Sequence, residues 1–475
     1  MSENASVSGQ PHRFRLIRGL RDLLPPESSL WNHVERVARE VFGSFGLGEI
    51  RPPIFEAANL FEKSIGEDTD VAAKELYFWV DSPRTNTGIR RTRAVAKQTH
   101  EKASDANSRV RAELIRQAES ESCDSLEETD LVALRPEATA SVCRAYIEHG
   151  MQQLPQPVKL YYMGPMFRRE RPQKGRYRQF YQIGAEVLGG NDAPATDAEV
   201  IEMVMTFFDK LELPGLELNI NSIGHNAPDC RPKYVELLRA ELRKVKDQLG
   251  TDSQRRIETN PLRVLDSKLE SEQAIIAKLP RIADHLCDAC ATHYADVKNQ
   301  LQLRGVIYRE NWRLVRGLDY YMRTTFEVTA KGLGSQNAVC GGGRYDGLVE
   351  LLGGPPTKGI GFAIGEDRLI LSLQDAGKGA VQQGRDVYIA WMGKHAYPAA
   401  VHIGKLLRNA GFSVELPPSE QKFGKALERA SKLDSRYALI LGDNEVSEGS
   451  YTLKTLADGT QQHFTEPQLL EFLKL

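Results

Sequence analysis

The densest group of residues able to bind an anion lies between Gly164 and Phe180. From Gly164 to Arg178 the stretch holds six Lys or Arg residues against one acidic residue, Glu170, in a chain whose net charge is only −2. Six like charges in a short loop repel one another, so a nucleotide phosphate or an RNA backbone is the natural compensation. The pattern favours an anion-binding loop between two strands over a solvated cationic hairpin, because nearby carboxylates do not balance it.

The sequence LRPEAT at residues 134–139 carries a carboxylate and a hydroxyl where a turn opens into a helix. Glu137 and Thr139 at the mouth of a sheet would suit recognition of an ammonium group. An ordinary capped helix start explains the same residues equally well.

Two further motifs place arginines near possible pockets. In LVRGLDYY, residues 314–321, Arg316 could hold a phosphate and the tyrosines could line a pocket, although a turn with aromatic packing is an equal alternative. Arg368 follows a buried-strand pattern at residues 359–365 and falls in the first turns of the next helix. At that position the Arg368 side chain could contact a nucleotide or be exposed to solvent.

Three consecutive glycines occur in CGGGRYDG, residues 340–347. Consecutive glycines allow backbone and ligand to approach closely. The spacing is not that of a Gly-x4-Gly-Lys-Ser/Thr phosphate loop, and the motif on its own predicts a tight turn.

The cysteines allow, but do not favour, a metal site. The series Cys287-x2-Cys290-x2-His293 has metal-like spacing, and Cys230 or His285 could supply a fourth donor. Only one such pair exists, so helix packing is the preferred interpretation and no metal site is predicted. Six cysteines in 475 residues also do not form a disulfide framework.

The elements that must position these residues belong to a multidomain α/β protein. Hydrophobic residues make up 41% and charged residues 27% of the chain, which is ordinary for a globular protein. No window approaches the roughly 20 apolar residues of a membrane span, and the first residues lack an apolar signal core. We therefore expect a cytoplasmic protein of about three domains' length.

Hydrophobic spacing predicts a helix over residues 27–45 and half-buried antiparallel strands over 159–163, 180–186, 216–221 and 324–329. A mostly helical, polar block over residues 229–302 interrupts these strands, as an inserted domain would. After a Gly- and Gln-rich linker that starts near residue 374, the pattern alternates β, α, β, α, β, which predicts a C-terminal domain with a largely parallel sheet.

The stretch at residues 84–128 differs from its surroundings. Between residues 84 and 121 it carries a net charge of +4 and few large apolar side chains. Such a composition predicts a solvated, partly helical or disordered insertion, with a basic arm that touches nucleic acid as the alternative.

Taken together, these motifs closely resemble the histidyl-tRNA synthetases, which are class II aminoacyl-tRNA synthetases, in their bacterial form. The resemblance covers nearly the whole chain apart from the first dozen residues and the insertion at 84–128. RGLDYY and GGGRYDGL are specific to this family. The FRRE loop (residues 167–170) and GFAIGEDRL (residues 361–369) fit class II enzymes generally. The motifs that carry it are IRGLRDLLP (17–25), FEKSIGEDTDV (61–71), LRPEAT, GPMFRRERPQKGRYRQF, NPLRVLDSK (260–268), RGLDYY, GGGRYDGL and GFAIGEDRL.

The resemblance implies a six- or seven-stranded antiparallel sheet with a helical insertion at about 225–308, all within a catalytic domain spanning 1–380. A C-terminal α/β domain at 385–475 would bind the anticodon. The implied reaction joins ATP and histidine into histidyl-adenylate and then transfers histidine to the 3′ end of tRNA(His), with Mg²⁺ on the phosphates. The family is typically a homodimer.

The resemblance also assigns roles to positions of this sequence. Arg168 and Arg316 would be catalytic, at the α-phosphate and the histidine carboxylate. Glu170, Arg176 and Arg368 would join Arg168 in binding ATP, with Arg368 at the γ-phosphate. Histidine would be bound by Arg168, Arg316, Glu137, Ala138, Thr139, Gln182, Glu186, Tyr320 and Tyr321, with Ala138 standing where the family usually has glycine.

Two other functions compete with this one. A synthetase-like regulatory subunit of histidine biosynthesis would keep the catalytic fold but lack the anticodon domain and parts of the pocket. A pure RNA-binding protein would not explain a complete amino-acid pocket.

Overall fold

The computed structural model describes residues 14–66, 69, 71–81, 131–318, 320–330, 337–379 and 384–474. The insertion predicted at residues 84–128 lies outside the described residues. The chain divides into two compact units. One runs to Gly379 without Leu24–Leu30, and the other comprises Leu24–Leu30 and the chain after Gly379.

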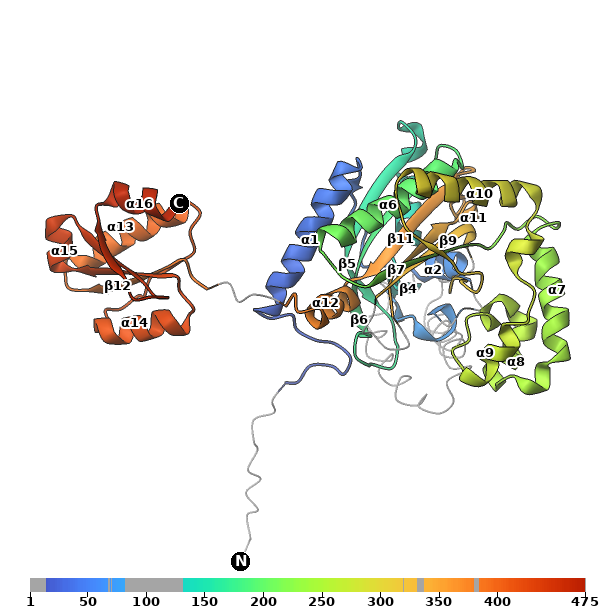
Figure 1. The fold of residues 1–475 in the computed structure, drawn as a ribbon, viewed down its shortest axis with the longest axis horizontal. Coiled ribbons are helices and arrows are strands. Elements are labelled where there is room, and N and C mark those ends of the chain that lie inside the picture. Colours follow the sequence, from blue (N-terminus) through green and yellow to red (C-terminus); the bar gives the residue numbers. More distant parts are fainter. Residues whose placement is uncertain are drawn as a thin grey trace, which may run out of the picture. The chain divides into compact units, whose positions relative to one another are not determined.

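An eight-stranded sheet forms the centre of the first unit, in the order β1-β5-β6-β11-β10-β9-β7-β8 (Figure 1). The six inner strands pair antiparallel throughout, which confirms the predicted antiparallel sheet. The two-residue edge strands β1 and β8 pair parallel to their neighbours. The strands are β1 (Gly48–Glu49), β5 (Val158–Phe167), β6 (Gln179–Leu188), β7 (Leu216–Ser222), β8 (Arg309–Glu310), β9 (Met322–Ala330), β10 (Ala338–Arg344) and β11 (Gly359–Gly365).

Helices α1 (Glu27–Ser44), α6 (Pro194–Lys210) and α12 (Glu366–Asp375) pack on this sheet. Apolar residues at helical spacing give α1 a buried face, as predicted from the sequence. On that face the ring of Phe42 contacts Phe207 of α6 and Phe362 of β11, with both pairs of ring centroids 5.8 Å apart. Buried aromatic contacts of this kind fix the helices against the sheet.

A smaller three-stranded sheet, in the order β2-β4-β3, leads into the LRPEAT motif. It contains β2 (Phe55–Ala57), β3 (Phe78–Val80) and β4 (Leu131–Leu134), and it packs with α2 (Ala58–Ile65), the short π-helix η1 (Val71–Glu75) and α5 (Thr139–Glu148). After α5 come the 3₁₀ turn η3 (Met151–Gln153) and, much later in the chain, α11 (Leu348–Leu351), which contacts α5.

Helices occupy the block between β7 and β8, as expected from its composition. In Figure 1, α7, α8 and α9 form a cluster of their own beside the sheet. This cluster has its own core, which includes Leu238, Leu242, Ile257 and Ile276. The elements are α7 (Arg231–Lys244), η4 (Lys246–Gln248), α8 (Thr251–Thr259), η5 (Pro261–Val264), α9 (Glu270–Ile276), η6 (Ile282–His285) and α10 (Asp288–Leu303).

The second unit contains a five-stranded sheet in the order β13-β12-β14-β15-β16. The first three strands are parallel, as predicted, but β15 and β16 add an antiparallel edge that the sequence interpretation lacked. The elements are β12 (Val387–Met392), α13 (Ala396–Asn409), β13 (Val414–Glu415), α14 (Phe423–Lys432), β14 (Tyr437–Gly442), α15 (Asp443–Glu448), β15 (Tyr451–Thr455), β16 (Gln461–Phe464) and α16 (Glu466–Lys474). The sheet is therefore mixed, with its own apolar core.

Among the described residues, no helix combines the length and the apolar composition that crossing a bilayer would take.

Candidate active site

A cavity of about 250 Å³ lies over the inner strands of the eight-stranded sheet. The strand registers bring distant motifs to it, since Gly341 of β10 lies opposite Glu327 of β9, and Gly365 of β11 lies opposite Gln182 of β6. Every residue to which the sequence analysis assigned a role lines this cavity except Ala138 and Glu186. Those that line it are Glu137, Thr139, Arg168, Glu170, Arg176, Gln182, Arg316, Tyr320, Tyr321 and Arg368.

One end of the cavity is formed by the start of α5. The buried Glu137 carboxylate accepts hydrogen bonds from the backbone N–H groups of Thr139, at 2.7 Å, and Ala140, at 3.0 Å, and so satisfies the free end of the helix. Burial raises the pKa of Glu137, while these hydrogen bonds oppose the shift. The two alternatives for this motif are compatible, because the same carboxylate begins the helix and faces the cavity.

Glu186 of β6 contacts Thr139 at the start of α5 and is almost completely buried. Its carboxyl group accepts hydrogen bonds from the hydroxyls of Thr139, at 2.7 Å, and Tyr345. Burial raises the pKa of Glu186 to about 8, against the effect of these two donors. A ligand that brings a positive charge or an N–H donor to Glu186 would lower this pKa and favour the ionised form.

Close to Glu186 lies a group of aromatic and polar side chains. The ring of Tyr320 lies 4.7 Å from that of Tyr321 and 5.7 Å from that of Tyr345, measured between centroids. The Gln182 Oε1 atom is buried and has no hydrogen-bond partner among the described residues. Aromatic faces next to unsatisfied polar atoms suit a planar heterocycle that carries N–H groups.

Arg316 also lines the cavity. Its guanidinium lies 3.2 Å from the Glu327 carboxylate and over the ring of Tyr321, and its buried Nε has no partner among the described residues. Burial lowers the pKa of Arg316, but the neighbouring Tyr321, Glu327 and Cys340 outweigh that effect and raise it. The site thus holds a partly buried cation whose Nε donor has no partner among the described residues.

Three more arginines line the cavity. The Arg168 Nε donates to the Pro136 carbonyl at 3.0 Å, Arg176 pairs with Glu170 at 3.1 Å, and Arg368 donates to the Ala338 carbonyl at 3.0 Å. Burial and the positive charges of Arg176 and Arg168 lower the pKa of Arg368. Cations that repel one another inside a cavity favour the binding of an anion such as a phosphate chain.

The tight turn predicted for the glycine triplet is wrong. The three glycines lie in strand β10, and atoms of neighbouring elements occupy the space beside each of them. A Cβ on Gly341 would stand 2.0 Å from the Arg316 Nη2, and one on Gly342 would stand 2.4 Å from the Phe326 ring. Gly341 therefore makes room for Arg316, and the triplet as a whole allows close packing of neighbouring elements rather than a bend.

Ala138 lies in the buried core beside α5 and not in the cavity lining. Its backbone has φ −111° and ψ −15°, a conformation that alanine adopts without strain. A methyl group at this position therefore does not narrow the cavity directly.

Sequence reasoning missed two residues of the site. Tyr345 lies within the GGGRYDGL motif, but nothing in the pattern indicates that its hydroxyl reaches Glu186, a residue far away in the chain. Glu327 lies in a strand with β periodicity, and only the register that places it beside Arg316 reveals its role.

Comparison with known proteins identifies the family. A family model described as histidyl-tRNA synthetase matches residues 123–369. The histidine–tRNA ligase of Koribacter versatilis is 46% identical over 465 residues, which cover 97% of this chain and 96% of that relative. The chain belongs to the histidyl-tRNA synthetase family. This confirms the resemblance on which the sequence analysis relied, and the class II fold with it.

Other relatives agree with this membership. The histidine–tRNA ligase of Solibacter usitatus is 47% identical over 458 residues, covering 96% of this chain and 98% of the relative. The apo histidyl-tRNA synthetase of S. aureus has a similar structure, with a TM-score of 0.72 and 32% identity, over 98% of this chain and all of that one. A model described as an anticodon binding domain matches residues 386–474, so the regulatory-subunit alternative is not favoured.

Proposed function

We propose that this protein is a histidine–tRNA ligase, which activates histidine with ATP and transfers it to the 3′ end of tRNA(His). The observation that carries the proposal is the composition of one cavity. Polar and aromatic side chains and a group of arginines that includes Arg316 line the same cavity, in a chain of the histidyl-tRNA synthetase family.

The histidine side chain would bind against Gln182, Glu186, Tyr320 and Tyr321, and its α-amino group against Glu137 and Thr139. An imidazole has two ring nitrogens that need polar partners when buried. The buried Gln182 Oε1 has no hydrogen-bond partner in the part of the chain that the structure describes, and Glu186 can change its charge on binding. An amino acid without those nitrogens would leave these groups unpaired, which is a strong basis for rejection.

The phosphates of ATP would bind the arginines. We assign Arg168 to the α-phosphate, Arg368 to the γ-phosphate, and Glu170 with Arg176 to the adenine and the phosphates nearby. The histidine carboxylate attacks the α-phosphorus, the bond to the bridging oxygen breaks, and pyrophosphate leaves. No side chain has to act as nucleophile, so the rate gain comes from in-line positioning and from Arg168 and Arg316 stabilising the developing charge.

Mg²⁺ would accompany ATP. Magnesium prefers oxygen ligands and usually binds through one or two carboxylates together with substrate phosphates. Glu170 and Glu327 fit this role because both are carboxylates that line the cavity beside its arginines. When bound, the ion neutralises phosphate charge.

The tRNA would reach the cavity from its basic side. A second cavity of about 620 Å³ shares residues Arg176, Arg368, Glu327 and Ala338 with the first, and Arg256, Arg263 and Lys268 also line it. Basic side chains along such a path suit the phosphates of an RNA 3′ end. We further propose that residues 1–380 form the catalytic domain and 385–475 the anticodon-binding domain, in a cytoplasmic homodimer, as in the family.

Charging of tRNA tests this proposal. Purified protein, ATP, Mg²⁺ and labelled histidine should yield acid-precipitable label on tRNA(His) and none on a tRNA for another amino acid. Equal labelling of both tRNAs, or labelling with an amino acid other than histidine, would contradict the assigned specificity.

A further inference from the structure

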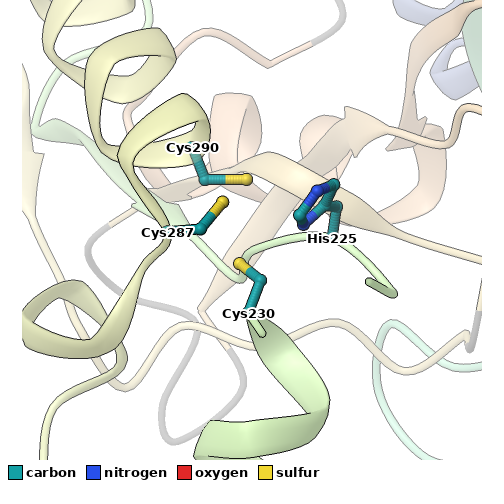
Figure 2. Close-up of side chains that lie close together, drawn as sticks. All are labelled: His225, Cys230, Cys287 and Cys290. Atoms are coloured by element: carbon teal, nitrogen blue, oxygen red, sulfur yellow. The ribbon is translucent and has the colours of Figure 1, made fainter. Parts of the chain in front are cut away.

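Four metal-binding side chains converge away from the active site, at the base of the helical insertion. His225 and Cys230 lie between β7 and α7, and Cys287 and Cys290 lie at the start of α10. Their side chains point toward one another in Figure 2. The insertion leaves the sheet near the first pair and returns through α10 near the second, so the cluster joins both connections.

The geometry matches a tetrahedral metal site. The ligand atoms of the four residues all lie within 4.8 Å of one another. Sulfur atoms about 2.3 Å from a tetrahedral zinc ion are about 3.8 Å apart, so little movement is needed to close the site. Three thiolates and one imidazole form a Cys₃His set, which is a common donor set of structural zinc sites.

Two features show that the surroundings are built around the cluster. The His225 Nδ1 atom is buried and has no hydrogen-bond partner among the described residues. A Cβ on Gly224, whose φ is +65°, would stand 2.9 Å from the Cys230 Sγ, so glycine admits that sulfur. Orphaned polar atoms in native structures call for an explanation, and a bound ion supplies one.

We propose that His225, Cys230, Cys287 and Cys290 bind one Zn²⁺ ion that has a structural role. Four protein ligands leave no open position for water or substrate, which distinguishes such a site from a catalytic zinc site. The ligand set differs from the one weighed in the sequence analysis. His293 instead contacts the Asp192 carbonyl at 3.1 Å and lies near Asp197, and His285 packs against Tyr234.

The ion would hold the insertion against the start of β9. The backbone N–H of Arg323 donates to the Gly224 carbonyl at 2.7 Å, and that of Ile223 donates to the Arg323 carbonyl at 2.9 Å. Arg231, next to Cys230, donates to the Tyr321 carbonyl. Because metal binding contributes to folding free energy, zinc should stabilise this junction.

Metal analysis of the full-length protein tests the proposal without any activity assay. After purification under reducing conditions with zinc in the medium and desalting, the protein should carry about one zinc per chain. The double variant Cys287→Ser/Cys290→Ser should lose it, whereas Cys143→Ala, at a buried cysteine outside the cluster, should keep it. Wild-type protein that carries no zinc and cannot be loaded with it would overturn the proposal.

If the double variant fails to fold, the absorption spectrum of Co²⁺-loaded protein and the alkylation of its thiols still test the site. Wild-type protein loaded with Co²⁺ should show the visible absorption bands of tetrahedral thiolate coordination. These bands should be weakened in His225→Ala but unchanged in His285→Ala.

Alkylation of Cys230, Cys287 and Cys290 should be blocked when zinc is bound and should proceed after the zinc is chelated. Chelation should also lower the midpoint temperature of thermal unfolding. A disulfide among these cysteines in protein purified under reducing conditions, or equal alkylation with and without zinc, would contradict the site.

Discussion

At the scale of single residues, the site places charges where water cannot screen them well. Arg316 is surrounded by Glu327, the Tyr321 ring and the backbone of Gly341, and one of its buried donors has no partner among the described residues. A buried donor that is already held in place can stabilise developing charge without reorganising.

Replacing this arginine should therefore remove transition-state stabilisation. For Arg316→Ala we expect a loss of roughly 3 kcal/mol or more, about 100-fold or more in the rate of adenylate formation, by analogy with loss of one charged transition-state contact. Single-turnover adenylation with saturating ATP and histidine measures it. Arg436→Ala, in the second unit and next to Tyr437, serves as the arginine control and should keep the wild-type rate. An adenylation rate near wild type in Arg316→Ala would remove this residue from the mechanism.

Glu186 makes the stability of the fold depend on pH. In the unfolded chain a glutamate titrates near 4.3, but burial holds the pKa of Glu186 at about 8 in the folded protein. Between these values the folded chain keeps a proton that the unfolded chain has released. Raising the pH across this window therefore weakens folding, by up to about 1.4 kcal/mol per pH unit for one such group.

The variant Glu186→Gln should remove this dependence, because an amide does not titrate. Between about pH 5 and pH 8 its free energy of unfolding should fall less steeply than that of the wild type. Urea denaturation of both proteins across the pH series measures the difference. The buried carboxyl of Asp367, whose pKa is also raised by burial, is shared by both proteins and its contribution cancels. Parallel curves for the two proteins would show that Glu186 is ionised in the folded state.

Many residues of the candidate site could be predicted from the sequence. The charge density of residues 164–178 indicated an anion site by itself, and family motifs gave the remaining positions. Tyr345 and Glu327 escaped notice because their roles depend on cross-sheet neighbours. No spacing along the chain reveals which side chain will lie opposite another.

At the scale of elements, strand β10 shows why glycine was misinterpreted. Glycine in sequence indicates freedom to turn, yet in β10 it provides space for Arg316 and Phe326 from other elements. Amphipathic α1 and the alternating strands could be predicted because their patterns are local. The short antiparallel strands β15 and β16 were missed, since four or five residues of mixed polarity give a weak periodic signal.

A methyl group at Gly341 should displace the arginine that it would touch. We expect Gly341→Ala to lower kcat/KM for histidine activation on the order of 100-fold, as misplacement of a catalytic group by about 1 Å does. Gly43→Ala in α1 is the matched control, because nothing lies within 4 Å of its added Cβ. That change should leave activity intact and stabilise the helix by about 1 kcal/mol. Similar activities for the two alanine variants would show that Arg316 does not depend on this space.

At the scale of the whole molecule, the two units have separate sheets and separate cores. The cavity that we assign to adenylation lies wholly in the first unit, while the match to the anticodon-binding family covers residues 386–474. We therefore expect activation of histidine to need only the first unit, and recognition of the tRNA to depend on the second.

A chain that ends at Gly379 should keep histidine-dependent exchange of pyrophosphate and lose tRNA charging. Both reactions are measured on the same preparation, with circular dichroism to establish that the shortened chain is folded. Full charging by a folded shortened chain would show that the second unit is not needed to select tRNA.

The central claim is that one cavity binds histidine and ATP and joins them. Histidine-dependent ATP–pyrophosphate exchange on the purified full-length protein tests it most directly, with the other amino acids as controls. We predict exchange with histidine alone. A folded protein that binds histidine but gives no exchange would contradict the account and favour a non-catalytic, histidine-sensing role.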